Sequence, residues 1–298
     1  MKSYYRVLAM VAIVAGLIFG ACGKEESSDG SSINANNGSE QPSAGGFDEN
    51  GASNALFSVS ANQKVRFSRG NLQYQATTHK WRFAEEQYAV NGEDNMNISS
   101  TYDGWIDLFG WGTGNNPTNA STNKEEYDEF HEWGDNAIIN GGNRANMWRT
   151  LTATEVQYLF ETRPNAAGRY GVANIEGVRG LILLPDNWVN PAGVHEFVPG
   201  ITRNVTTWDN NQYTIEEWSL MENAGAILLP AAGIRSGTQV NSLWNQGRYW
   251  SSTRCPIIGD EVHSYRAHTL TFSDHDLLPI EGFDIYKGFS VRLVMDAQ

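Results

Sequence analysis

Cysteine is almost missing from this chain of 298 residues, which contains only Cys22 and Cys255. Two cysteines allow one disulfide at most, which excludes a small fold held together by several bridges. Long apolar runs are missing as well. The longest one, residues 7 to 19, has roughly 13 residues, whereas a helix that crosses a bilayer needs about 20. A permanent transmembrane helix is therefore not expected.

Basic side chains are scarce. The chain has 21 Lys and Arg against 34 Asp and Glu, which gives a formal net charge of −13, and its basic residues form no cluster. Such a chain repels phosphate backbones, so nucleic acid is not an expected partner. Calcium or a cationic surface is electrostatically compatible, although acidity alone does not show that either one binds.

The N-terminus has the layout of a secretory signal, with Lys2 and Arg6 before the apolar run. Small residues then precede a cysteine in Phe19-Gly20-Ala21-Cys22, which resembles the lipobox of bacterial lipoproteins. The resemblance implies removal of residues 1–21 and acylation of Cys22, so that a lipid holds the chain on a membrane. The alternative is an ordinary signal peptide with an incidental cysteine.

Residues 22–53 are rich in Gly, Ser, Asn and acidic residues, and Phe47 is their only aromatic. Such a composition buries too little surface to offset chain entropy, so we expect a flexible acidic tether behind the lipidated cysteine. Lys24-Glu25-Glu26 resembles the export signal of Bacteroidetes lipoproteins. It implies a lipid-anchored position on the outer membrane that faces the cell exterior; a periplasm-facing position is the alternative.

A folded region follows the tether. Residues 56 to 60 and 64 to 68 alternate apolar and polar side chains, and residues 72 to 74 and 80 to 83 extend the pattern. We therefore expect an N-terminal β-hairpin element over 54–99 and a second domain over 100–298. Residues 91 to 146 are loop-like yet carry six large aromatics from Trp105 to Trp133, so we expect a packed loop.

Two helices are predicted, because Thr152 with Glu155 and Thr214 with Glu217 each fit a capping box before apolar positions. The first is expected to bury Val156, Leu159 and Phe160, and the second Trp218, Leu220 and Met221. Each precedes an apolar strand, at 180 to 185 and 225 to 230, and the similarity of these strands suggests either a repeat or similar core constraints. Strands are also expected at 247 to 252, 267 to 272 and 288 to 294, with loops between them. The fold class is therefore α+β, with two helices and a mostly antiparallel, twisted sheet.

Three C-terminal segments carry a family resemblance: Leu228-Leu-Pro-Ala-Ala-Gly233, Tyr249-Trp-Ser-Ser-Thr253 and Gly288-Phe-Ser-Val-Arg-Leu-Val294. Together with the order of elements, they resemble the Fibrobacter succinogenes major paralogous domain family over about residues 100 to 298. That family is similar in fold to C-type lectins and formylglycine-generating enzymes. The resemblance implies a C-type-lectin-like domain in a Bacteroidetes lipoprotein, and it implies fold more than function.

Calcium-dependent sugar binding and oxidase activity are both disfavoured. The Glu-Pro-Asn or Gln-Pro-Asp and Trp-Asn-Asp triplets of calcium-using lectins are missing, and Trp208-Asp209-Asn210 has its oxygen ligands in the wrong order. The related oxidases use a pair of cysteines, whereas only Cys255 is left after lipidation. The histidines near the C-terminus have irregular spacing and match no metal signature. We therefore expect no enzyme activity, no metal and no cofactor.

The C-terminal stretch is the remaining candidate for binding, because it holds side chains suited to contacts. The candidates are Trp244, Arg248, Tyr249, Arg254, His263, Tyr265, Arg266, His268, Asp274, His275 and Asp276. We expect a surface-displayed lipoprotein that binds a protein or glycan ligand through this face, with or without diversification of the face by a retroelement. The alternatives are a structural or adhesive component of an outer-membrane assembly, in which residues 100 to 135 pack against a partner, and thirdly an enzyme related to the oxidases.

Overall fold

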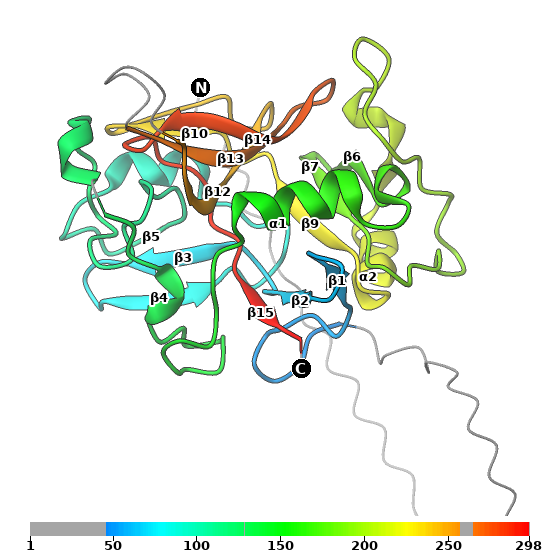
Figure 1. The fold of residues 1–298 in the computed structure, drawn as a ribbon, viewed down its shortest axis with the longest axis horizontal. Helices are drawn as coiled ribbons and strands as arrows, with labels where there is room; N and C mark the ends of the chain where they lie inside the picture. The colour runs from blue at the N-terminus through cyan, green and yellow to red at the C-terminus, as the bar shows by residue number, and fades with distance from the viewer. Residues whose placement is uncertain (1–45, 128, 257–264, 298) are drawn as a thin grey trace, which may run out of the picture. The chain divides into compact units, whose positions relative to one another are not determined.

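The computed structural model describes residues 46–127, 129–256 and 265–297. They belong to one compact unit, Pro42–Gln298, and the predicted signal peptide, Cys22, most of the tether and His263 lie outside the described residues. The unit is mixed α+β, mostly strands with few helices, and β6 with β8 is the one parallel pair among the described strands. The predicted α+β class is confirmed (Figure 1).

The first predicted hairpin is confirmed. It consists of β1 (Phe57–Ser58) and β2 (Lys64–Phe67), which pair antiparallel with Phe57 opposite Val65. On its other side β2 pairs with β15 (Val294–Asp296), so the two ends of the described domain lie in one sheet (Figure 1). The last predicted strand, residues 288 to 294, forms isolated bridges over much of its length, and regular pairing begins only at Val294.

Residues 46–53, which composition places in the tether, pack on this sheet. Ala52 is fully buried and bridges to Ser68, while the Asp48 carboxylate lies 2.9 Å from the Arg66 guanidinium. The Ser53 N–H also donates to the Phe67 carbonyl, and the Arg66 guanidinium donates to the Ser53 and Ala52 carbonyls. Composition alone does not reveal such contacts.

The second predicted hairpin is also found, but in a separate sheet. β3 (Leu72–Gln75) pairs with β4 (Lys80–Phe83) and, on its other edge, with β5 (Trp105–Ile106). This sheet packs against the aromatic loop, in which Phe109, Trp111, Tyr127 and Trp133 are all buried. The prediction that the loop is packed is confirmed.

The two similar apolar strands are neighbours in a four-stranded sheet. β7 (Val178–Leu183) pairs antiparallel with β9 (Ile227–Pro230), and the sheet has the order β8-β6-β7-β9. Its other members are β6 (Tyr170–Ile175) and β8 (Gln212–Tyr213). Residues on the two faces of this sheet belong to two hydrophobic clusters, so both strands are apolar along their length.

Both predicted capping boxes are present. Helix α1 (Ala153–Gln157) begins after Thr152 and continues as a π-helical turn over Tyr158–Thr162, and α2 (Ile215–Asn223) begins after Thr214. The predicted core residues Val156, Leu159, Phe160, Trp218 and Met221 are buried. Leu220 was predicted wrongly: it is 43% exposed, because Trp218 and Met221 occupy the core side of α2.

The C-terminal sheet contains a strand that the sequence pattern does not reveal. β12 (Gly247–Arg254) pairs with β13 (Arg266–Phe272), which pairs with β14 (Leu277–Asp284). The loop expected after residue 272 is therefore wrong over β14. Pro279, Gly282 and a register shift interrupt that strand, which hides its alternation. The proline is tolerated because β14 is at the edge of the sheet, where one side needs no backbone donor.

The other elements are short. β10 (Ile234–Ser236) and β11 (Gln239–Asn241) form a hairpin, and 3-10 turns occur at Gly92–Asn97 (η1), Lys124–Tyr127 (η2), Trp133–Asp135 (η3), Ala166–Gly168 (η5) and Trp208–Asn210 (η6). In the described part of the chain, no helix has both the length and the apolar character needed to span a membrane.

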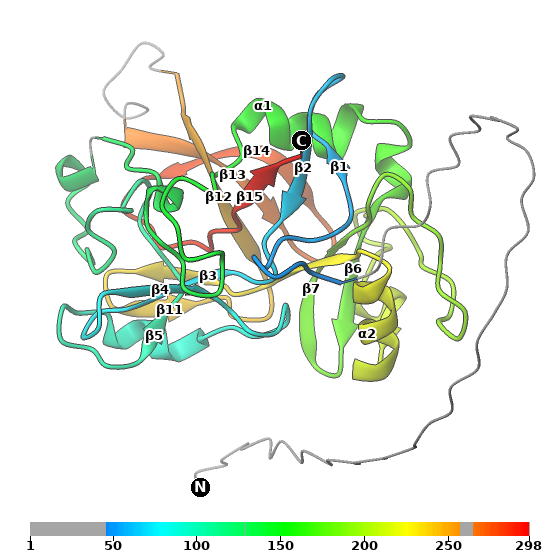
Figure 2. The same ribbon diagram turned by 90° about the horizontal axis from the view of Figure 1, so that it is seen from below.

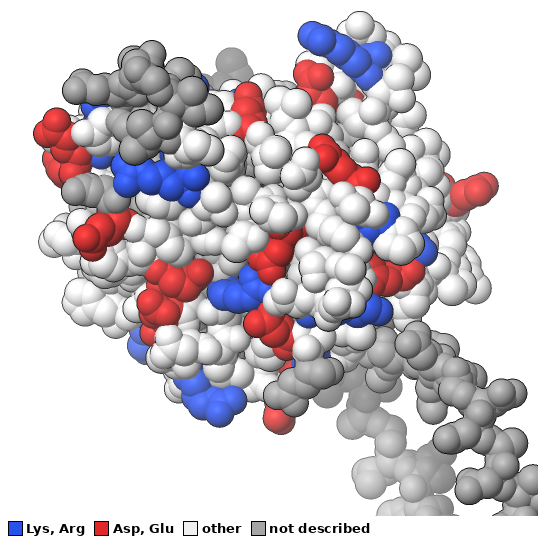
Figure 3. Space-filling view, viewed as in Figure 1, with Lys and Arg blue, Asp and Glu red and all other residues white. Residues whose placement is uncertain are grey.

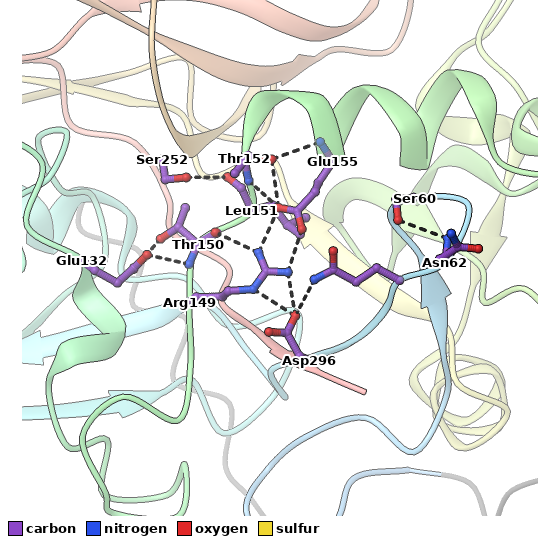
Figure 4. Close-up of polar contacts among 11 residues, drawn as sticks. Ser60, Asn62, Glu132, Arg149, Thr150, Leu151, Thr152, Glu155, Ser252 and Asp296 are labelled. Atoms are coloured by element: carbon purple, nitrogen blue, oxygen red, sulfur yellow. Dashed lines mark hydrogen bonds and ion pairs between the residues drawn. The ribbon is translucent and has the colours of Figure 1, made fainter. Parts of the chain in front are cut away.

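An ion-pair network joins α1 to the C-terminal strand (Figure 4). Arg149 donates two hydrogen bonds to Glu155, of 2.9 and 2.7 Å, and two to Asp296 Oδ1, of 3.0 and 2.7 Å. Glu155 is also the acidic member of the first capping box. One guanidinium thus fixes the start of α1 relative to β15, and the forked geometry makes these charge-assisted bonds stronger than neutral ones.

Candidate functional site

Tyr249 has to be removed from the predicted binding face. Its side chain is buried, and its hydroxyl accepts a 3.1 Å hydrogen bond from Asn71 Nδ2 and donates one of 3.0 Å to the Pro230 carbonyl. Burial raises the pKa of the Tyr249 hydroxyl above its ordinary value. Its position in the strand places it on the face of β12 that packs against α1 and its neighbours, so Tyr249 is a core residue.

Other candidates on this sheet are engaged with their neighbours. The Arg248 guanidinium lies 3.7 Å from the centre of the Phe283 ring, and Arg266 Nε lies 3.4 Å from Asp284. His268 and Trp244 are half-buried. Burial lowers the pKa of His268, which favours the neutral ring.

The turn after β13 holds three more candidates. His275 Nδ1 lies 2.6 Å from Asp274 and its Nε2 3.4 Å from Asp276, so the imidazole pairs with both flanking carboxylates. Within the described ranges, no three His, Cys, Asp or Glu side chains gather in a way that could hold a metal ion.

The remaining candidates, Arg254 and Tyr265, lie next to a distant part of the chain. The Arg254 guanidinium is 5.9 Å from the centre of the Trp111 ring, and the Lys124 ammonium is 4.2 Å from the centre of the Tyr265 ring. Trp111 and Lys124 belong to the aromatic loop. The end of β12 and the start of β13 therefore adjoin residues 111 to 131.

That loop encloses a hollow of about 310 Å³, which we call the 111–131 hollow. Its lining consists of aromatic, amide, carboxylate and small polar residues: Trp111, Gly112, Thr113, Asn115, Asn116, Asn119, Glu125, Glu126, Tyr127, Glu129 and His131. The volume is at the lower end of the range of small-ligand sites, roughly 300 to 1,000 Å³.

Backbone contacts hold the two walls of the hollow together. The His131 N–H donates 3.0 Å to the Gly112 carbonyl, and the Gly114 N–H donates 3.1 Å to the His131 carbonyl. Gly112 has φ +66°, and a Cβ there would lie 2.6 Å from Phe130 Cα, so only glycine fits this contact. Tyr127 closes the base, since its buried hydroxyl donates 2.8 Å to the Ser121 carbonyl. The walls are therefore held together by contacts that do not involve the side chains at the mouth of the hollow.

Several side chains at the mouth have unused hydrogen-bonding groups. Among the described residues, the exposed side chains of Asn115, Asn116 and Glu125 make no hydrogen bond or ion pair, whereas Glu126 accepts 2.8 Å from Ser121. Glu129 Oε2 lies 3.8 Å from His131 Nε2. The hollow thus offers amides and carboxylates to a solute, and its lining contains no Lys or Arg. Figure 3 shows acidic side chains grouped where Figure 1 draws segment 124–127.

A second hollow, of about 320 Å³, lies between β6, β8 and the start of α2. Its polar groups are largely used within the fold. Glu217 completes the capping box and lies 2.9 Å from His195, and Asn174 Oδ1 accepts 2.7 Å from the Gly177 N–H. These contacts explain the residues by structure alone, so the 111–131 hollow is the stronger candidate for binding.

Cys255 is half-buried beside Gly282, and burial raises the pKa of its thiol. A raised pKa disfavours the thiolate, which is the reactive form. A nucleophilic role for this cysteine therefore has no support in its surroundings.

The sequence pattern did not single out the lining of the 111–131 hollow. The aromatic content of this stretch predicted packing, but the asparagines and glutamates between the aromatics looked like ordinary loop residues. What could have pointed to them is the occurrence of amides and carboxylates in a loop that its aromatic residues predict to be packed.

No protein-family model matches the chain, no curated protein is significantly similar to it, and no solved structure matches its fold at significance.

Proposed function

We propose that this chain is a surface-displayed lipoprotein, anchored through Cys22, whose domain has a C-type-lectin-like fold and binds a glycan in the 111–131 hollow without catalysing a reaction. The lipobox-like segment and the acidic stretch behind it support the anchor and the outward position. Two capped helices with antiparallel sheets are in keeping with the lectin-like fold.

The observation that carries the proposal is the set of unused polar groups around the 111–131 hollow. Sugar hydroxyls both donate and accept hydrogen bonds, and amide and carboxylate side chains offer matching partners. Asn115 and Asn116 offer donors as well as acceptors, and Glu125 offers acceptors only. Arg254 and Tyr265, which adjoin this loop, are the members of the predicted C-terminal face best placed to extend the site.

A glycan array tests this proposal. The full chain is expected to bind a restricted set of glycans, and binding should persist in chelator, because no metal is required. Replacing Asn115 and Asn116 together by alanine should weaken binding about tenfold or more, since each lost hydrogen bond contributes about 0.5–1.5 kcal/mol. The fold should survive, because these side chains make no bonds within the described structure. Absence of binding to every glycan would refute the proposal.

A structural or adhesive role is the second candidate, and the edge strand β14 favours it. Leu278 and Ile280 are 44% and 39% exposed there. Replacing both by threonine should reduce cell-surface assembly if this candidate is correct, and should leave glycan binding unchanged if the hollow is the site.

A further inference from the structure

We infer that one face of the domain docks onto the lipid surface of the membrane that holds the Cys22 anchor. This face consists of loop 187–206, helix α2 and Leu56, and we call it the exit face, because the described chain begins beside it. The inference rests on the lipid anchor of the proposed function and adds the orientation of the domain on the membrane.

The exit face adjoins the first described residue. A Cβ on Gly46 would lie 3.5 Å from Asn223 Oδ1, at the C-terminal end of α2. Residues 23–45, which are 23 residues, connect Gly46 to Cys22. A random-coil chain of that length spans roughly 24–29 Å between its ends. A lipid on Cys22 therefore keeps the side of the domain that carries α2 nearest the membrane.

Exposed apolar side chains are concentrated on this face. Leu56, Val189 and Leu220 are 36%, 77% and 43% exposed. The Asp186 N–H donates 3.1 Å to the Leu56 carbonyl, and a Cβ on Gly193 would lie 4.0 Å from Leu220 Cδ1. The segment from 186 to 193, which contains Val189, therefore joins the other two residues in one patch.

The apolar character continues along the loop. Val198 and Val205 are 44% and 69% exposed. The exit face thus holds five of the nine large apolar side chains that are exposed in the described part of the chain. Single exposed apolar residues are ordinary on a protein surface, whereas a concentration of them marks a site of contact.

The loop carries almost no charge, although the chain as a whole has a net charge of −13. Glu196 and Arg203 are its charged residues and cancel each other, and His195 pairs with Glu217 at 2.9 Å. Helix α2 adds the exposed carboxylate of Glu216. Apolar side chains enter the boundary between headgroups and acyl chains favourably, whereas charged ones lose hydration there. A nearly neutral apolar face therefore fits a lipid surface.

A weak contact is sufficient for docking, because the anchor already holds the domain at the membrane. A short flexible linker gives an effective concentration on the order of millimolar. A few valine and leucine side chains that could not retain a free chain on a bilayer can therefore keep an anchored one docked for much of the time.

Docking leaves the 111–131 hollow accessible. Segment 124–127, which contributes to its lining, lies at the left margin in both Figure 1 and Figure 2, whereas α2 and loop 187–206 lie toward the right margin in both. The hollow and the exit face are therefore on opposite sides of the domain. A docked domain presents the hollow away from its own membrane.

Photolabelling tests the docked orientation. The lipidated chain is reconstituted into phosphatidylcholine vesicles that include a phosphatidylcholine with a diazirine near the headgroup end of its acyl chain. After illumination, mass spectrometry should find lipid adducts in peptides from loop 187–206 and α2. They should exceed the adducts in residues 111–131 about fivefold or more, because only inserted side chains reach the diazirine.

A matched pair of double variants tests the apolar side chains. Val189→Asp with Leu220→Asp should reduce the exit-face adducts about fivefold or more, since carboxylates oppose insertion. Met96→Asp with Ile139→Asp is the control and should leave them unchanged, because Met96 and Ile139 are 42% and 46% exposed but lie outside the exit face. Val189→Asp alone, at the most exposed of these positions, should reduce the adducts in the same direction and keeps the test valid should the double variant unfold.

The outcomes separate docking from anchoring. Adducts spread evenly over a vesicle-bound chain, or confined to another face, would overturn the docked orientation and leave the lipid anchor in place. Exit-face adducts that the Val189 and Leu220 substitutions do not reduce would overturn it as well. A purified wild-type chain that carries no lipid and does not float with the vesicles would instead refute the anchor, and the docking with it.

Discussion

At the scale of single residues, buried polar groups tie the C-terminal segment to the N-terminal one. Arg292 is buried, donates 3.2 Å to Asn71 Oδ1 and also donates to Gln87 Oε1. Asn71 in turn donates to the Tyr249 hydroxyl. Arg292 lies in the segment 288–294, and these contacts explain its presence there by structure alone. Burial lowers its pKa to about 10, which still leaves it charged at neutral pH.

Replacing Arg292 by methionine should destabilise the domain by about 1–3 kcal/mol, because Asn71 and Gln87 each lose a donor inside the core. Chemical denaturation measures the change. Arg203→Met, at an exposed position, is the matched control and should stay within about 0.5 kcal/mol of the wild type. Equal stability of the two variants would show that the buried network contributes nothing.

Asp107 is the second buried group with a measurable consequence. Burial raises the pKa of its carboxyl to about 6, although it accepts hydrogen bonds from the Asn91 backbone and from Asn95. The folded state therefore holds a proton that the unfolded state has lost between about pH 4 and 6. This group's contribution to the free energy of unfolding falls as pH rises through that window and is constant above it.

Asp107→Asn should remove this trend. The difference in unfolding free energy between wild type and variant should change by roughly 2–3 kcal/mol between pH 4 and pH 7, with the wild type losing stability relative to the variant as pH rises. Asp186 and Asp296, whose pKa values are lowered, produce the opposite trend in both proteins, so they cancel in the difference. A pH-independent difference would contradict the assignment.

At the scale of elements, the two capping boxes look alike in sequence but differ in their surroundings. Glu155 also accepts the two Arg149 hydrogen bonds (Figure 4). Glu217 instead pairs with the half-exposed His195. Glu155→Gln should cost about 1–2 kcal/mol, and Glu217→Gln less than about 1 kcal/mol. Thermal unfolding of the two variants ranks them, and the reverse order would mean that the network does not stabilise α1.

Local patterns predicted the elements whose signals are local. The β1 and β2 hairpin, both helix starts and the strands β7, β9, β12 and β13 were foreseen, because alternation and capping depend on neighbours in sequence. Strand β14 was missed, since Pro279 and a register shift break its pattern at a sheet edge. Of the predicted site, Arg254 lies beside Trp111 of the hollow, Tyr265 lies beside Lys124 of the same loop, and Tyr249 is buried. This distinction depends on contacts between segments that are distant in sequence.

At the scale of the whole molecule, the two halves of the chain build their structures together. Strand β15, at the end of the described chain, pairs with β2 near its beginning. Residues 111 to 131 form the hollow, and Arg254, which is far away in sequence, lies next to Trp111 in its lining. Figure 2 shows from below how the early strands β1 and β2 lie beside β15.

The proposed anchor makes its own prediction at this scale. The wild-type chain should fractionate with membranes and be cleaved by protease added to whole cells, whereas Cys22→Ser should release it from the membrane fraction, because the acyl chains are lost. Cys255→Ser is the control and should stay membrane-bound. Membrane association of the Cys22 variant would contradict lipid anchoring.

The location of the bound glycan is the central claim, and hydrogen exchange of the full chain measures it directly. With the tightest-binding glycan present, amides of residues 111–119 and 124–131 should exchange more slowly than in the free chain, while the second hollow near Glu176 and Glu217 should be unchanged. Slower exchange confined to that second hollow, or to β14, with none in residues 111–131, would contradict the account.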